Sequence, residues 1–105
     1  MEVVKFTQET YNEAIKGEAP VLVDFFATWC GPCKMMSPVV DAYAAAHDEI
    51  TVGKVDVDEL GDVARSLGIM SIPTFIVFKG GEEVARHVGS MSRGALDKFV
   101  EEAIK

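Results

Sequence analysis

The chain has 105 residues, of which 49% are hydrophobic and 26% charged, a composition typical of one globular domain rather than a disordered or membrane-spanning protein. Ten basic and seventeen acidic side chains give a formal net charge of −7, which disfavours nucleic acid and anionic lipid surfaces as partners. Neither a membrane-spanning apolar run nor a signal peptide is evident, so we expect a cytoplasmic protein.

Strand-like and helix-like segments alternate from the beginning of the chain. Residues 3–6 predict a short strand. A helix is expected to begin at Thr10, with Glu13 as its capping-box partner, and to end at Gly17. Residues 20–27 form a nearly continuous apolar run, which is typical of a central strand covered on both faces.

The middle of the chain repeats this alternation. Apolar residues recur with helical spacing from Cys33 to about His47, and Pro38 is expected to kink this helix. Residues 50–57 predict another strand. The apolar face of residues 60–67 indicates a helix that ends at Gly68.

The last third of the chain predicts a hairpin and a helix. Residues 74–78 are β-branched and aromatic, residues 80–81 are a glycine pair, and residues 83–88 form the returning strand. Ser92 is positioned to cap a final helix with one apolar stripe. Parallel strands need helical crossovers, so we expect a single α/β domain, residues 1–105, with a mixed sheet and helices on both faces.

The only two cysteines, Cys30 and Cys33, are separated by two residues. A zinc or iron–sulfur site needs more ligands than the chain offers, and His47 and His87 lie far apart in the sequence. Haem attachment needs histidine directly after the second cysteine, where this chain has Lys34. A structural disulfide would close too small a loop to restrict the unfolded chain much. The remaining interpretation is a dithiol that cycles with its disulfide.

The position of the pair supports this interpretation. Cys30 follows a buried strand and precedes a helix, whose unpaired N–H groups and partial positive charge favour a thiolate. We therefore expect Cys30 to be the exposed, acidic nucleophile and Cys33, one turn further on, to be more buried.

Residues 25–34 read Phe-Phe-Ala-Thr-Trp-Cys-Gly-Pro-Cys-Lys, and this segment resembles the active-site signature of the thioredoxin family. The resemblance covers essentially the whole chain and includes Asp24, Lys54, residues 72–74, residues 80–81 and residues 88–89. It implies the thioredoxin fold, a central five-stranded mixed β-sheet flanked by four α-helices. It also implies a monomeric protein-disulfide reductase. Its only redox group would be the Cys30–Cys33 disulfide, its electron donor a thioredoxin reductase, and its substrates disulfide-containing target proteins.

Asp24 interrupts an apolar strand, and two interpretations are open. It lies at a water-facing strand end, or it is a buried carboxylate with a raised pKa that relays protons to Cys33. The resemblance favours the second interpretation and makes Lys54 its charge partner.

The resemblance also implies a docking surface for target proteins. Its residues are Gly31, Pro32, Ile72, Pro73, Val88 and Gly89, and the Ile72–Pro73 bond is expected to be cis. Trp29, the only tryptophan, is either a core residue or a cover for the site. Asp56, Asp58 and Glu59 are expected to be solvated charges, and His47 a surface residue.

Two rival functions are considered beside the reductase. A redox-independent binding or assembly subunit would keep its role without the cysteines. An oxidase or isomerase would hold its disulfide at a less reducing potential. No phosphate-binding glycine motif is present, so nucleotide and flavin are assigned to the electron donor.

Overall fold

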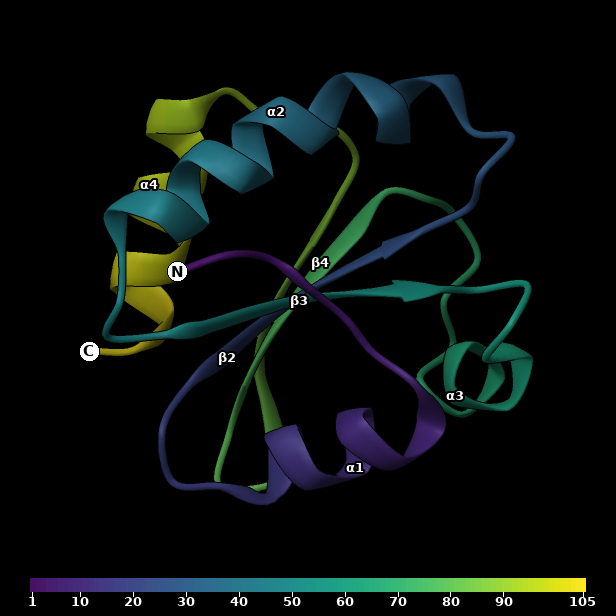
Figure 1. Cartoon of the computed structure of the whole chain (residues 1–105), viewed down its shortest axis with the longest axis horizontal. Coiled ribbons are helices and arrows are strands. Elements are labelled where there is room, and N and C mark those ends of the chain that lie inside the picture. The colour runs from purple at the N-terminus through teal and green to yellow at the C-terminus, as the bar shows by residue number, and fades with distance from the viewer.

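A computed structural model describes residues 1–105 as one five-stranded mixed sheet with four helices (Figure 1). The elements in chain order are β1 (Val4–Lys5), α1 (Gln8–Lys16), β2 (Val21–Phe26), α2 (Gly31–Ala46), β3 (Thr51–Asp56), α3 (Gly61–Ser66), β4 (Thr74–Lys79), β5 (Glu82–Val88) and α4 (Arg93–Ala103). The strand order is β1-β3-β2-β4-β5. β2 pairs in parallel with β3 and antiparallel with β4, so the expected fold class is confirmed.

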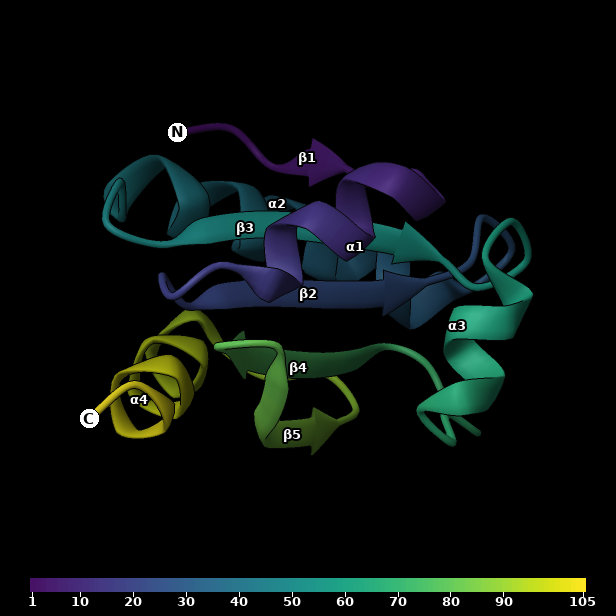
Figure 2. The same ribbon diagram turned by 90° about the horizontal axis from the view of Figure 1, so that it is seen from below.

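The sheet separates two apolar cores. Leu22 of β2 packs with α2 and α4, whereas Val23 and Phe25 pack with α1 and α3 on the opposite face. Figure 1 shows the sheet nearly edge-on, with α2 and α4 on one side of the strands and α1 and α3 on the other. Figure 2 shows the sheet nearly face-on, with α1 in front of the strands and α2 behind them. Because side chains alternate along a strand, Asp24 belongs to the face covered by α2. None of the helices has the length and hydrophobicity that a membrane-spanning segment requires.

The first helix begins earlier than expected. Its N-cap is Thr7, whose hydroxyl accepts a hydrogen bond from the Thr10 N–H, while the Thr10 hydroxyl accepts one from the Thr7 N–H. This reciprocal pair is a capping box built from two threonines, and it replaces the expected pairing of Thr10 with Glu13. Gly17 ends the helix as predicted.

The hairpin and the last helix follow their sequence signals. Gly80 and Gly81 have φ angles of 62° and 83°, the left-handed conformation that a two-residue hairpin turn requires and glycine readily adopts. Ser92 accepts a hydrogen bond from the Ala95 N–H at 3.1 Å and so caps α4.

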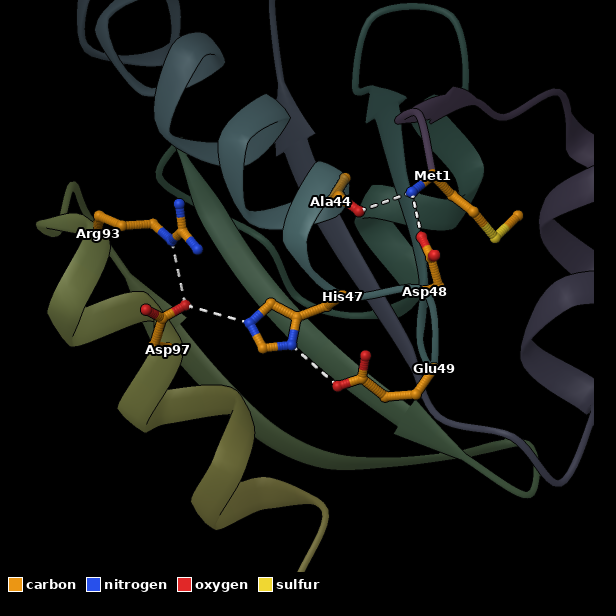
Figure 3. Close-up of polar contacts among 7 residues, drawn as sticks. All are labelled: Met1, Ala44, His47, Asp48, Glu49, Arg93 and Asp97. Atoms are coloured by element: carbon orange, nitrogen blue, oxygen red, sulfur yellow. Dashed lines mark hydrogen bonds and ion pairs between the residues drawn. The ribbon is translucent and has the colours of Figure 1, made fainter.

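The carboxyl end of α2 is linked to α4 through His47 (Figure 3). The imidazole stacks on the Tyr43 ring, with 4.2 Å between centroids. One ring nitrogen lies 2.9 Å from Glu49 and the other 3.6 Å from Asp97, which also pairs with Arg93. His47 is therefore a half-buried bridge between two helices rather than the simple surface residue that was expected.

Candidate active site

The two cysteines form a disulfide where β2 leads into α2. Cys30 is the N-cap residue of α2, and the Cα atoms of Cys30 and Cys33 lie 5.3 Å apart. The Cys33 N–H donates to the Cys30 sulfur at 3.2 Å. Pro32 lies within the first helical turn, where a missing N–H costs nothing. For this reason α2 begins at Gly31, ahead of the expected start at Cys33.

The expected exposure of Cys30 is wrong in this disulfide state. Only 5% of Cys30 is exposed, close to the 3% of Cys33. Ala27 packs directly with the disulfide, and Val57 and Ile72 cover it from the neighbouring loops. The Cys30 sulfur lies 3.9 Å from the Ile72 carbonyl oxygen. The burial of Cys30 is therefore set by loops that are distant from it in sequence.

Asp24 is buried in the middle of β2, with 4% of its surface exposed, so the water-facing interpretation is wrong. Its Oδ1 atom has no hydrogen-bond partner. Burial raises the Asp24 pKa from 3.8 to about 7, the positive charge of Lys54 opposes this rise, and the negative charge of Asp41 adds to it. The carboxyl group therefore changes protonation near neutral pH.

Lys54 lies opposite Asp24 in the register of β2 and β3. It forms no ion pair with Asp24; its Nζ atom lies over the Phe26 ring, 5.4 Å from the centroid. The ammonium group is thus close enough to act on the Asp24 carboxyl through its field, without neutralising it by direct contact.

The Ile72–Pro73 bond is cis, as the resemblance implied. The Gly89 N–H donates to the Pro73 carbonyl oxygen at 2.8 Å, and Val88 pairs with Thr74 at the end of the hairpin. These contacts bring two segments, residues 72–73 and 88–89, together beside the disulfide. Val88 is 56% exposed.

Trp29 is not a core residue, because 69% of its surface is exposed. Its indole N–H donates to Asp58 Oδ2 at 2.8 Å. The Asp58 N–H donates in turn to Asp56 Oδ1 at 2.9 Å, and Asp56 is buried. The expectation of a solvated charge is therefore wrong for the buried Asp56, whereas Asp58 is exposed as expected and also binds the Trp29 indole. β3 is parallel to β2, so its carboxyl end delivers these residues to the edge where Trp29 lies.

An apolar hollow of about 190 Å³ lies next to Trp29. Its lining residues are Trp29, Val57, Ile69, Met70, Ser71 and Ile72. Met70 is 96% exposed. Gly31 and Pro32 are also exposed, on the α2 side of the disulfide. Exposed apolar residues thus lie beside the disulfide, among them Trp29, Met70 and Val88.

Residues 2–102 match the thioredoxin family model. The chain belongs to the thioredoxin family. It is 49% identical to a thioredoxin of Alicyclobacillus acidocaldarius over 92 residues, which is 87% of this chain and 88% of that protein. It is 48% identical to thioredoxin-2 of Saccharomyces cerevisiae over 81 residues, or 76% and 78% of the two chains.

Solved thioredoxin structures agree with this assignment. The thioredoxin of Nicotiana alata superposes with a TM-score of 0.88 at 39% identity, covering 97% of this chain and 92% of its own. The thioredoxin of Plasmodium falciparum gives 0.89 at 37% identity, covering 95% and 98%. With the redox-active cysteine pair in place, this member of the thioredoxin family is a thiol–disulfide oxidoreductase that reduces protein disulfides.

The thioredoxin site contains no arrangement for a metal ion. No group of three or more His, Cys, Asp or Glu side chains anywhere in the chain is placed to hold one. The reacting group that the structure does contain is the Cys30–Cys33 disulfide.

Proposed function

We propose that Cys30 is the nucleophile and Cys33 the resolving thiol of this reductase. The observation that carries the proposal is the Cys33 N–H, which points at the Cys30 sulfur from the first turn of α2. In the reduced protein this N–H and the partial positive charge of the helix terminus stabilise a thiolate on Cys30 and not on Cys33.

The reaction is a pair of thiol–disulfide exchanges. The Cys30 thiolate attacks one sulfur of a target disulfide, forms a mixed disulfide and releases the other target sulfur as a thiolate. Cys33 then loses its proton and attacks Cys30, which breaks the mixed disulfide and releases the second target sulfur. Two electrons pass to the target, its two sulfurs take up two protons, and the Cys30–Cys33 disulfide closes.

Asp24 is proposed as the group that accepts the Cys33 proton. Its pKa of about 7 and its place on the α2 face of the sheet support this role, because a general base works best when its pKa lies near the working pH. Lys54 is proposed to favour the ionised form of Asp24 through its positive charge.

The surface around the disulfide is proposed to dock the target protein. Its members are Trp29, Gly31, Pro32, Ile72, Pro73, Val88 and Gly89. The apolar character of this surface and the exposure of Trp29 and Val88 support the assignment, since exposed apolar patches mark interaction sites. An extended target segment could pair with the backbone at Ile72 like an added strand.

Electrons are proposed to reach Cys30 and Cys33 from a separate thioredoxin reductase, which would carry the nucleotide and flavin. A relative from Mycobacterium leprae is a bifunctional thioredoxin reductase/thioredoxin, 46% identical over 87 residues that form 82% of this chain and 19% of that protein. We further propose that residues 1–105 act as a single cytoplasmic domain, as a monomer, with no cofactor beyond the disulfide.

Trapping the mixed disulfide tests the assignment of the two cysteines. The Cys33→Ser variant should accumulate a covalent adduct with a disulfide-containing target, visible on a non-reducing gel and located at Cys30 by mass spectrometry. The Cys30→Ser variant is the matched control and should capture nothing. An adduct formed by Cys30→Ser alone would reverse the assignment. Capture by neither variant, together with an inactive parent protein, would refute the proposed function.

A further inference from the structure

The loop between β5 and α4, residues 89–92, shares Gly89 with the proposed docking surface. It begins at Gly89, whose N–H is bonded to Pro73, and it ends at Ser92, the cap of α4. Gly89 has a φ of 103°, so the chain turns sharply as it leaves β5. The start of the loop is therefore fixed to Pro73, and its end is fixed to the first turn of α4.

A third contact fixes the middle of this loop from the side of α2. The Met91 N–H donates to the thioether sulfur of Met36 at 3.5 Å. Met36 is 3% exposed and packs in the core between the sheet, α2 and α4. It lies three residues after Cys33, which places the sulfur one helical turn beyond the resolving cysteine.

We propose that Met36 is a positioning residue. Its sulfur holds the loop 89–92 in the position in which the loop contacts a docked target protein. This inference rests on the proposed docking function of Val88 and Gly89. The contact joins that loop to the helical turn that follows Cys33. The position of the loop relative to the disulfide is therefore fixed.

The sulfur atom, not only the bulk of Met36, is required by this account. Leucine fills a similar volume and is tolerated in cores in place of methionine, but it offers no acceptor for the Met91 N–H. A thioether is a weak acceptor. Its loss should therefore loosen the loop while leaving the rest of the fold intact.

The Met36→Leu variant tests the proposal through two readouts. Hydrogen exchange at the Met91 N–H should become faster, whereas exchange at the Ala95 N–H in α4 should not change. The rate constant for reduction of a disulfide-containing protein should fall about two- to tenfold, which is the effect of losing one modest hydrogen bond. Reduction of bis(2-hydroxyethyl) disulfide, which is too small to reach the loop, should proceed at the parent rate.

Met35→Leu is the matched control, because Met35 precedes Met36 on the same helix and is 77% exposed. It should leave both readouts unchanged. Unchanged exchange at Met91 in Met36→Leu would overturn the contact. Faster exchange with an unchanged rate toward the protein target, or an equal loss toward both disulfides, would overturn the positioning role. Failure of the proposed function is distinct from these results, since the parent protein would then reduce neither disulfide.

Discussion

Replacing Asp24 by asparagine should change how the stability of the oxidised protein depends on pH. The side chain is buried, with a pKa raised from 3.8 to about 7 because burial disfavours the charged form. The folded state therefore binds the Asp24 proton more tightly than the unfolded chain does. The stabilisation that protonated Asp24 contributes to the folded state is complete below pH 3.8. It is lost as the pH rises toward about 7, and above that pH no further stability is lost through this group.

The size of this effect follows from the pKa shift. Each pKa unit corresponds to about 1.4 kcal/mol, so at neutral pH the ionised carboxyl costs the folded protein about 4 kcal/mol relative to strong acid. Asparagine keeps the shape and carries no charge at any pH. The free energy of unfolding of Asp24→Asn, relative to the parent, should therefore increase by about 3 to 4 kcal/mol between pH 4 and pH 8.

Urea unfolding of both proteins in the disulfide form, followed at several pH values, measures this difference. Glu102→Gln is the matched control, because it removes one negative charge from an exposed position on α4. Its difference from the parent should stay within about 0.5 kcal/mol across the range. A difference between Asp24→Asn and the parent that is the same at pH 4 and pH 8 would refute the assignment of a neutral-pH titration to Asp24.

Three other substitutions test separate contacts. Asp58→Ala removes the acceptor of the Trp29 indole; the fluorescence anisotropy of this single tryptophan should fall and target reduction should slow, and an unchanged anisotropy would contradict the role of the hydrogen bond. Met70→Asp places a charge on a residue that is 96% exposed beside the apolar hollow. Stability should change by less than about 0.5 kcal/mol and KM for a protein target should rise about three- to tenfold, whereas an unchanged KM would exclude Met70 from docking. Gly53→Ala would place a methyl group against the buried Phe6 ring and should destabilise the protein by about 1–3 kcal/mol in urea unfolding; parent-like stability would show that Phe6 can move aside.

The sequence predicted the elements whose signals are local. The glycine pair at 80–81, the cap at Ser92 and the buried strand at 20–27 each depend on neighbouring residues only. The start of α1 was misassigned because threonine can serve at either position of a capping box, and the chain contains both Thr7 and Thr10. Choosing between them requires the backbone path before the helix.

The site was harder to predict wherever distant segments meet. The burial of Cys30 depends on Ile72 and Val57, and neither position is indicated by the residues around the cysteines. A run of carboxylates is usually solvated, and this expectation fails for Asp56, which is buried. The signal that could have placed Asp56 and Asp58 beside Trp29 is the parallel pairing of β2 with β3. This pairing brings the residues that follow both strands to the same edge of the sheet. Trp29, which is exposed at that edge, donates its indole N–H to Asp58.

A single-turnover experiment tests most directly that this protein reduces disulfides through Cys30 and Cys33. The fully reduced protein, freed of other thiols, is mixed with an equimolar disulfide-containing protein, quenched with acid, and both partners are mapped by mass spectrometry. The account predicts that each Cys30–Cys33 disulfide formed is matched by one target disulfide converted to two thiols, with no adduct remaining. A target that stays oxidised while the cysteines stay reduced, or a stable adduct as the end product of the parent protein, would contradict it.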